Sequence, residues 1–396
     1  MGFMEKERKI EEVLSRGVAE VIHLDHLRAK LLEGKPLRVK FGIDPTSPHI
    51  HLGRATVIWK LRELQDLGHT IVFIIGDFTG IIGDTSDKES ERPMLSRETV
   101  EQNLATYFEQ AGKILDMSKV EKHRNTEWLE KLTYREITEH AEVFSLSDFI
   151  SRENIKIRLD AGKRVSLREL LYPLMQGYDS VAVGADIELG GTDQKFNMLA
   201  GRKLQERFGK EPQSILMLDL IEGLDGRKMS SSFGNTINLT DTQSDMFGKV
   251  MSLRDELIIK YFVHVTRVPM ERVSEYEAGL GRGENPRDAK LDLAEEIVSI
   301  YYGKEEAERA RETFLATFQK KEIPEDIEEI RGEGNLGTLL KTKEIVSSMN
   351  DWRRLVDEGA VKRLGEGGEE EKITDPLEQA TPGVYKIGKR RFVKII

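Results

Sequence analysis

Two short segments of the chain carry residue types that suit nucleotide chemistry. The first contains His51 and Gly53, just before a run of helical periodicity, and the second places Arg227 and Lys228 ahead of three serines. A helix N-terminus offers free amides to a phosphate, and a mobile lysine neutralises charge on a departing pyrophosphate. The two segments together predict the two halves of one ATP site.

The elements around the first segment alternate in type. Residues 37–43 read as a strand, the apolar positions between 57 and 67 recur at helical spacing up to Gly68, and residues 70–75 form a continuous apolar strand. Further strands are expected at 180–189 and 214–220. This order predicts an α/β fold with a doubly wound parallel sheet, which binds ligands at the carboxyl ends of its strands.

Individual residues of the first segment have distinct predicted uses. Gly53 permits close approach of a nucleotide, and Thr46 and His51 are able to donate hydrogen bonds to phosphate oxygens. A metal site built on His49 and His51 is disfavoured, because neither a carboxylate nor a third histidine lies nearby in the sequence. We therefore predict no protein-bound metal, while a loop of inactive histidines remains the alternative.

The periodicity also predicts how the chain is divided. Residues 1–238 form the α/β domain, residues 239–325 form an α-helical domain, residues 326–335 read as a linker, and residues 336–396 form a small α+β unit.

Composition narrows the function classes. The 396 residues carry a net charge of -10 and no cysteine, which excludes disulfides and cysteine nucleophiles. The longest apolar run is too short to span a bilayer and the N-terminus lacks a signal pattern, so we expect no membrane association and a cytoplasmic location. RNA binding would need a local basic patch. The last eleven residues supply one, or else a solvated tail, with Lys386, Lys389, Arg390, Arg391 and Lys394.

Five motifs occur in one order across nearly the whole chain. They are Asp44-Pro-Thr46, His51-Leu-Gly53, Thr79-Gly-Ile-Ile-Gly-Asp84, Tyr172-Pro-Leu-Met-Gln176-Gly-Tyr-Asp179 and Gly190-Gly-Thr-Asp-Gln194-Lys-Phe-Asn197. In order and spacing the chain resembles the bacterial tyrosyl-tRNA synthetases of class I. The resemblance implies a Rossmann-like catalytic domain, a helical anticodon-side domain and a terminal domain similar to that of ribosomal protein S-four.

The fourth motif places three polar residues at helical spacing. Tyr172, Gln176 and Asp179 fall at i, i+4 and i+7, so they share one helix face, although ordinary packing and capping would also explain them. The resemblance implies that Asp179 accepts the tyrosine phenol and that Tyr172, Gln176 and Asp84 hold the ammonium group. It also assigns Gly42, Asp44, Thr79 and Gln194 to the tyrosine site.

The resemblance assigns the ATP contacts as well. Asp193 would bind the ribose, Gln194 would lie near the reacting carboxylate, and Lys88 and Arg92 would clamp pyrophosphate. The remaining ATP contacts would be His51, Gly53, Arg54, Gly191, Lys228, Met229 and Ser231, and the groups acting in the chemistry Thr46, His51, Lys88, Arg92 and Lys228.

The implied reaction needs no protein nucleophile. L-tyrosine and ATP form tyrosyl-adenylate, and the tyrosyl group then passes to tRNA(Tyr), with Mg²⁺ on the phosphates and no tightly bound cofactor. The resemblance also implies a homodimer built through the catalytic domain. Its RNA contacts in the terminal domain would be Arg353, Arg354, Lys389, Arg390 and Arg391.

Three positions depart from the commoner family pattern. Arg54 follows Gly53 where a histidine is usual, Ser231 replaces a second lysine, and Lys40 stands where many tyrosyl enzymes carry a phenol-binding tyrosine. Three other readings remain open: a tryptophanyl-tRNA synthetase of the same fold, an RNA-binding paralogue without the chemistry, and a small-molecule nucleotidyltransferase.

Overall fold

The computed structural model describes residues 3–86, 94–319, 327–332, 334–343, 345–364, 370–388 and 391–396. The chain divides into two compact units. The first comprises Met1–Asp241 and Ser252–Leu293, and the second comprises Thr242–Met251 and Ala294–Ile396. The division of the chain into three domains with a linker stays a prediction.

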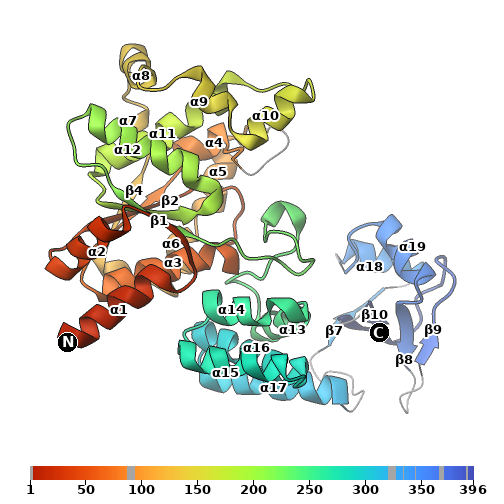
Figure 1. Cartoon of the computed structure of the whole chain (residues 1–396). Helices are drawn as coiled ribbons and strands as arrows, with labels where there is room; N and C mark the ends of the chain where they lie inside the picture. Colours follow the sequence, from red (N-terminus) through yellow and green to blue (C-terminus); the bar gives the residue numbers. More distant parts are fainter. Residues whose placement is uncertain are drawn as a thin grey trace. The chain divides into compact units, whose positions relative to one another are not determined.

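A six-stranded sheet forms the centre of the first unit (Figure 1). Its strand order is β1-β6-β5-β2-β3-β4, and all neighbours run parallel except β1, which is antiparallel to β6. The strands are β1 (Val18–Ile22), β2 (Arg38–Ile43), β3 (Thr70–Ile75), β4 (Val120–Arg124), β5 (Ile187–Gly191) and β6 (Ser214–Leu218). The doubly wound parallel sheet expected from the sequence is therefore confirmed.

The strand order creates a crevice between β2 and β5. From β2 the chain adds β3 and β4 on one side, and it later places β5 and β6 on the other side. Connections leave β2 and β5 in opposite directions at this point, so the carboxyl ends of these strands diverge and leave room for a ligand. Residues Asp44 and Gly191 stand at these two ends.

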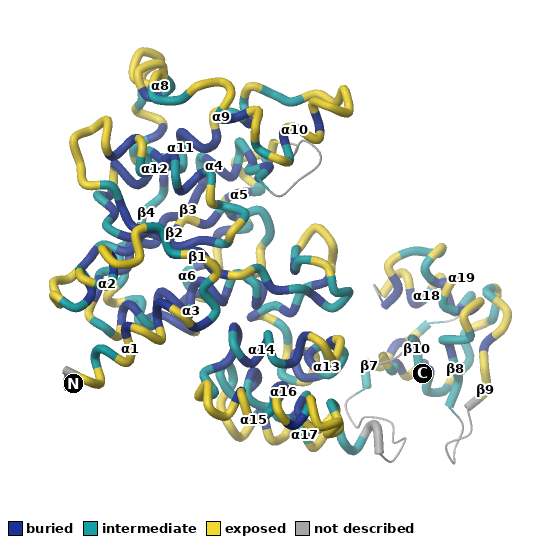
Figure 2. The backbone as a smooth tube through the Cα atoms, viewed as in Figure 1, coloured by how far each residue is buried: buried dark blue, intermediate teal, exposed yellow. Residues whose placement is uncertain are grey.

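Helices cover both faces of this sheet. Helices α11 and α12 lie against one face and α1 and α3 against the other (Figure 1), while the four central strands between them are largely buried (Figure 2). The helices before α11 are α1 (Phe3–Ser15), α2 (Leu24–Glu33), α3 (Leu52–Asp66), α4 (Asp77–Ile82), α5 (Arg97–Leu104), α6 (Tyr107–Gly112), α7 (Thr126–Leu129), α8 (Tyr134–Ala141), α9 (Leu146–Ile150) and α10 (Glu153–Asp160). The later helices of the first unit include α11 (Leu167–Val183), α12 (Lys195–Arg207), α14 (Ile258–Val265) and α15 (Met270–Gly281), whereas α13 (Gln243–Met251) belongs to the second unit.

The sequence explains where α11 begins and ends. Ser166 accepts a hydrogen bond from the helix's first turn and Glu169 accepts one from the backbone of Ser166, which is a capping box. At the other end Gly184 adopts φ of 62°, a left-handed conformation that glycine adopts without strain. This rigid helix carries Tyr172, Gln176 and Asp179.

The prediction of a strand at 180–189 was wrong in its first half. Residues up to Val183 belong to α11, and β5 begins only at Ile187. The apolar run from Val181 to Val183 packs as the buried end of a helix, and a short apolar run alone does not distinguish a helix from a strand. The strands predicted at 37–43, 70–75 and 214–220 are confirmed by β2, β3 and β6.

The second unit contains helices and a smaller sheet. The helices are α13 (Gln243–Met251), α17 (Lys304–Gln319), α18 (Leu336–Thr342) and α19 (Met349–Asp357), and the unit boundary falls within α16 (Pro286–Tyr302). The five-stranded sheet has the order β7-β11-β10-β8-β9. Its strands are β7 (Glu328–Ile330), β8 (Val361–Leu364), β9 (Glu370–Lys372), β10 (Gly383–Ile387) and β11 (Arg391–Ile395).

Part of the predicted linker is a strand. Residues Glu328–Ile330 pair in parallel with β11, and Ile330 enters the same buried cluster as Trp352 and Tyr385. Two glutamates followed by one isoleucine are too few residues to predict a strand from sequence, and this strand is recognised only by its pairing with β11.

Candidate active site

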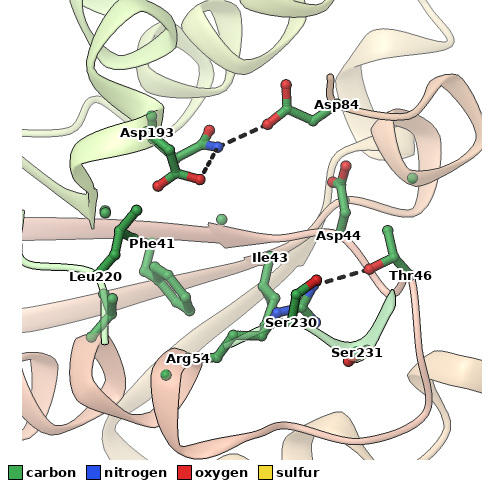
Figure 3. Close-up of a pocket in the computed structure, with 18 of the residues that line it drawn as sticks. Phe41, Ile43, Asp44, Thr46, Arg54, Asp84, Asp193, Leu220, Ser230 and Ser231 are labelled. Atoms are coloured by element: carbon green, nitrogen blue, oxygen red, sulfur yellow. Dashed lines mark hydrogen bonds between the residues drawn. The ribbon is translucent and has the colours of Figure 1, made fainter. Parts of the chain in front are cut away.

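A cleft of about 720 Å³ opens at the carboxyl ends of β2 and β5, where the strand order reverses. Its walls come from β2, the loop after it, the start of α3, α11, the turn after β5 and the loop after β6. Figure 3 shows Asp84 facing Asp193 across one part of this cleft, and Arg54 close to Thr46 in another. One cleft thus brings together residues from five sequence motifs.

Helix α3 begins where the sequence predicted a helix N-terminus. His51 is the N-cap residue and Leu52 the first helical residue, but the His51 side chain makes no capping hydrogen bond. The amide of Gly53 lies 3.3 Å from the sulfur of Met229, which belongs to the lysine-bearing loop. The first turn of α3 and that loop are therefore adjacent, as expected for two halves of one site.

His51 is buried and electrically neutral. Burial lowers the pKa of its imidazole to about 3, and the nearby charges of Arg54 and Lys228 act in the same direction. Within the described part of the chain its Nδ1 atom has no hydrogen-bond partner. A buried neutral imidazole with an unpaired ring nitrogen is poised to bind a polar group of a ligand.

Arg54 is fixed by two hydroxyl groups. Its guanidinium donates to Thr46 Oγ1 at 3.0 Å and to the hydroxyl of Tyr107 at 2.9 Å. The Tyr107 hydroxyl donates in turn to the carbonyl of Ser47 at 2.5 Å. A permanent positive charge is therefore held at the wall of the cleft beside the helix N-terminus, in the position where the family pattern has a histidine.

The loop that carries Lys228 is organised by Asn235. The amide group of Asn235 donates to Asp225 at 2.7 Å and to the carbonyl of Lys228 at 3.1 Å, and its oxygen accepts from the amide of Ser230 at 2.9 Å. The ammonium group of Lys228 lies 3.0 Å from Asp193 Oδ2. The lysine thus reaches across the cleft to the turn after β5.

Ser231 and Gly191 also border the cleft. The Ser231 hydroxyl lies 3.1 Å from that of Ser47, which joins the lysine-bearing loop to the loop after β2. A Cβ atom at Gly191 would lie 2.5 Å from a carboxylate oxygen of Asp193 and 2.8 Å from the side chain of Leu220. A larger residue here would therefore displace the side chains of Asp193 and Leu220.

The three residues of α11 that were predicted to share a face all line the cleft. Asp179 is the deepest of them, and its carboxylate accepts from Trp128 Nε1 at 2.7 Å and from Asn125 Nδ2 at 3.3 Å. Burial is the main cause that raises the pKa of Asp179 to about 7, against the opposing effects of Lys40 and these two donors. A carboxyl group with so high a pKa is a candidate functional group.

Asp44 ties three elements together at the end of β2. Its two carboxylate oxygens accept from Thr79 Oγ1 at 2.7 Å and from the Tyr172 hydroxyl at 2.9 Å. Thr79 accepts in turn from Asn125 Nδ2 at 2.9 Å. A Cβ atom on Gly76 would lie 2.0 Å from an oxygen of Asp44, so this arrangement depends on glycine. Gly42, which lies on β2 two residues before Asp44, also lines the cleft.

Asp84 joins its own loop to the turn after β5. One oxygen accepts from the amide and hydroxyl of Ser86, and the other accepts from Gln194 Nε2 at 2.8 Å. Gln194 also lies 3.4 Å from Asp193 through the same nitrogen (Figure 3). Loop capping, the alternative use considered for Asp84, therefore coexists with a position in the cleft.

The terminal sheet and the helix before it carry the cations predicted to meet RNA. Arg353 is exposed, with a 3.5 Å contact to Asn350, whereas Arg354 forms ion pairs with Asp351 at 2.7 Å and Glu358 at 3.1 Å. Arg391 donates to the carbonyl of Ile345. The structure thus leaves Arg353 the least engaged of these three. Lys88, Arg92, Lys389 and Arg390 lie outside the described residues.

Two residues next to Asp179 were missed from the sequence. Asn125 and Trp128 follow β4, more than fifty positions before Asp179, and only the fold brings them to it. The available signal was a polar residue directly after a strand of the sheet, where ligand-binding residues gather. Lys40, noted as a departure from the family pattern, does not replace the phenol contact directly and pairs with Glu188 at 2.8 Å.

The described part of the chain contains neither a metal-binding cluster nor a helix that could span a membrane. No group of three or more histidine or acidic side chains there could hold a metal ion. Among the same residues, none of the helices combines the length and apolar character needed to cross a bilayer.

Comparison with known proteins is consistent with the site. The family of class I tRNA synthetases for tryptophan and tyrosine matches residues 32–319. The tyrosine–tRNA ligase of Carboxydothermus hydrogenoformans is 45% identical over 97% of both chains, and that of Thermotoga maritima is 45% identical over 97% of this chain and 96% of its own.

Solved structures share the fold. The tyrosyl-tRNA synthetase of Archaeoglobus fulgidus, solved with L-tyrosine, superposes with a TM-score of 0.61 at 23% identity, covering 78% of this chain and 100% of its own. The mitochondrial enzyme of Aspergillus nidulans gives 0.64 at 20% identity, covering 80% and 98%. Because the family match spans most of the chain and the bacterial relatives align over nearly all of it, the chain belongs to the class I tRNA synthetases and, among them, to the tyrosine–tRNA ligases.

Proposed function

We propose that this protein activates L-tyrosine with ATP and transfers the tyrosyl group to the 3′ end of tRNA(Tyr), releasing pyrophosphate and AMP. The observation that carries the proposal is the composition of one cleft, which joins a buried carboxyl acceptor, a helix N-terminus and a lysine-bearing loop. The first suits a phenol, and the other two suit a triphosphate.

In this proposal Asp179 accepts the hydrogen bond of the tyrosine phenol. It is buried, and its neighbours Trp128 and Asn125 occupy only part of its accepting capacity. Phenylalanine would leave that buried acceptor unpaired, which is costly. Tyrosyl-tRNA synthetases as a class are known to prefer tyrosine over phenylalanine by about 10⁵-fold, which shows what such a contact can achieve. Tyr172, Gln176 and Asp84 would hold the ammonium group.

The triphosphate is proposed to lie against the start of α3. The positive end of this helix and the neutral His51 would attract and bind phosphate oxygens, with Thr46 and Arg54 beside them. Close approach of the nucleotide would use Gly53 and Gly191, while Asp193 would bind the ribose hydroxyls. Met229 and Ser231 would border the nucleotide from the lysine-bearing loop.

The first step forms one bond and breaks another. A carboxylate oxygen of tyrosine, oriented by Gln194, bonds to the α-phosphorus of ATP as the bond to the β-phosphate breaks and pyrophosphate leaves. Lys228 would leave Asp193 to meet the charge that develops on the pyrophosphate, together with Lys88 and Arg92. Mg²⁺ enters as part of the ATP substrate, bound to its phosphates.

The second step transfers the acyl group. A ribose hydroxyl at the 3′ end of tRNA(Tyr) attacks the tyrosyl carbonyl, loses its proton, and AMP leaves. The net charge of -10 opposes RNA binding over the molecule as a whole, so local cations must supply the contacts. We propose Arg353, Arg354 and Arg391, with Lys389 and Arg390, for this purpose, and a cytoplasmic location where the tRNA is found.

We also propose a homodimer formed through the catalytic domain. Exposed apolar side chains occur along the segment from α9 through α10 to the start of α11, and Figure 2 shows much of α10 and its flanking loops exposed. Exposed apolar clusters of this kind favour protein–protein contact. The residues are Leu146, Ile157, Leu159, Leu167 and Leu171.

Charging of a tRNA(Tyr) transcript with labelled tyrosine tests the proposed function. Wild-type protein should give acid-precipitable tyrosyl-tRNA only with ATP and tyrosine both present. Phenylalanine and tryptophan serve as competitor substrates in the control reactions. Absence of charging with tyrosine, or equal charging with tryptophan, would contradict the proposal.

A further inference from the structure

A lysine–glutamate ion pair is buried directly behind the wall that carries Asp179. Lys40 on β2 is 0% exposed, and its ammonium group contacts Glu188 at 2.8 Å, the carbonyl of Gln176 at 2.8 Å and Ser180 Oγ at 2.7 Å. An ammonium group has three protons to donate, and these three acceptors use all of them. Lys40 is therefore held in one position.

Glu188 on β5 connects this lysine to the cleft. Its carboxylate accepts from Gln176 Nε2 at 3.2 Å, from Ser180 Oγ at 3.2 Å and from Gln213 Nε2. Glu188 lines the cleft, whereas Lys40 is absent from the described residues that line it. The lysine acts from behind the wall, and the glutamate forms part of it.

The pair fixes a single turn of α11. Lys40 binds the backbone of Gln176 and Glu188 binds its side chain, and both charged groups bind Ser180. Asp179 lies between these two anchored positions. Any change in the pair must therefore shift the acceptor and the amide that face the substrate.

Stability alone does not explain such a pair. Two charges lose their hydration on burial, and a well-packed apolar pair in the same place is often equally stable or more so. In some proteins buried charges are kept because they specify one conformation. Here the anchored turn carries substrate-facing groups, which gives the pair a use beyond the fold.

The pair also influences the protonation of Asp179. Burial is the largest influence on the pKa of Asp179 and raises it; Lys40 follows as the main opposing influence, and Glu188 raises the pKa. The other titratable groups around Asp179 are Tyr172 on its own helix and, beside the ring of Trp128, His123 on β4. Tyr172 in turn faces the carboxylates of Asp44 and Asp84.

We propose that Lys40 and Glu188 are positioning residues that set the selectivity of this site for the phenol of tyrosine by anchoring the turn of Gln176 and Asp179 and by balancing the charge on Asp179. This inference rests on the proposed function. It gives the lysine, which stands where many relatives in the family pattern have a phenol-binding tyrosine, an indirect use in the same recognition.

Variants of opposite charge test the inference in the full-length protein. Tyrosine-dependent exchange of pyrophosphate into ATP is measured across the neutral pH range for wild type, Lys40→Met and Glu188→Gln. Loss of the positive charge should move the acidic limb of kcat/KM for tyrosine to higher pH by about one pH unit, and loss of the negative charge should move it to lower pH by a smaller amount. A purely structural role would not produce shifts of opposite sign.

Selectivity is the second readout. Lys40→Met should lower the ratio of kcat/KM for tyrosine to that for phenylalanine by about tenfold or more, mainly through the KM for tyrosine, with the KM for ATP unchanged. Lys60→Met is the matched control, because Lys60 is also buried and paired with a glutamate, at 2.6 Å from Glu63, but does not line the cleft. Lys60→Met should leave the acidic limb of the pH profile and the ratio of kcat/KM for tyrosine to that for phenylalanine as in wild type.

A lone buried charge can prevent folding, so the double variant Lys40→Met/Glu188→Gln carries the test independently. It has no unpaired charge, and the inference predicts that it folds yet discriminates about tenfold less well. Wild-type selectivity in the double variant, or limb shifts of the same sign in the single variants, would overturn the inference alone. Absence of tyrosine-dependent exchange in wild type would overturn the proposed function itself.

Discussion

At the scale of the residue, the site depends on a carboxyl group held in an unfavourable environment. Asp179 is buried at the carboxyl edge of the sheet, and the side chains that donate hydrogen bonds to it, Trp128 and Asn125, carry no charge. Burial removes the carboxylate from water and disfavours its charged form, so this acceptor costs stability at high pH. The cost is characteristic of a group kept for recognition.

Asp179→Asn should make the protein more stable above neutral pH. The pKa of Asp179 is raised to about 7, so the native state binds an extra proton, and stability is greatest below the unfolded pKa and falls as pH rises through 7. Asparagine removes this loss, which amounts to at most about 4 kcal/mol. Thermal melting from about pH 4 to above pH 7, the interval over which the native state holds the extra proton, measures it.

The same variant should recognise tyrosine poorly, because the charged acceptor is lost. A melting temperature of Asp179→Asn that follows pH with the slope of wild type would show that the carboxyl group does not titrate as described.

Lys228→Ala should slow adenylate formation at least tenfold while leaving tyrosine affinity nearly intact, because the lysine meets charge that develops only as pyrophosphate departs. Single-turnover pyrophosphate release measures the rate, and equilibrium binding measures the affinity. The neighbouring Arg227→Ala is the control, since that guanidinium pairs with Asp225 and stacks on Phe233. Equal rates in wild type and Lys228→Ala would remove Lys228 from the chemistry.

Sequence reasoning found the residues of the site that lie within one helix or one loop. The resemblance singled out Tyr172, Gln176 and Asp179, helical spacing predicted that they share one face, and the structure brings all three to the cleft. Asn125 and Trp128 could not be found in that way, because they meet Asp179 across more than fifty residues of chain. A buried contact over such a distance depends on how strands are ordered, which spacing does not encode.

At the scale of the element, helices α11 and α12 form the scaffold of the part of the cleft that is proposed to bind tyrosine. Gly177 lies where the two helices approach closely: a Cβ atom there would lie 3.0 Å from backbone atoms of Ala200 and Gly201. Such contacts are tighter than ordinary packing, and backbone atoms cannot move aside cheaply. The absence of a side chain at this position therefore sets the distance between the helices.

Gly177→Ala should destabilise the protein by about 1–3 kcal/mol despite the better helix propensity of alanine. Gly248→Ala in α13 is a matched control, because a Cβ atom there meets no atom within 4 Å, and it should be neutral or slightly stabilising. Chemical denaturation measures both. Equal stability of Gly177→Ala and wild type would contradict the close packing of α11 and α12.

The elements themselves were predictable where their pattern was long or flanked by turn residues. The βαβ unit from β2 to β3 was found because helical spacing ends at Gly68 and an apolar run follows. The end of α11 was misread as strand, since Val181–Val183 is apolar and β-branched residues favour strands. Packing against the sheet overrides that local preference.

At the scale of the whole molecule, the proposed homodimer would use the exposed apolar side chains between α9 and the start of α11. Leu167, which is 77% exposed, lies on this proposed surface. Symmetric dimers bury the same patch from both copies, so one substitution affects the interface twice.

Leu167→Asp should therefore shift the protein from dimer to monomer in sedimentation, with little effect on the folding of each chain. Leu377→Asp is the control, because Leu377 is 71% exposed on the terminal unit, outside the proposed surface. A wild-type protein that sediments as a monomer, or a Leu167→Asp variant that remains dimeric, would contradict the proposed surface.

Pyrophosphate exchange into ATP, run with each of the twenty amino acids in turn, tests the central claim most directly. The cleft requires a substrate with a hydrogen-bond donor that reaches Asp179 and a carboxylate that reaches ATP, so exchange should depend on tyrosine alone. Exchange with tryptophan in place of tyrosine, or no exchange with any amino acid, would contradict the account.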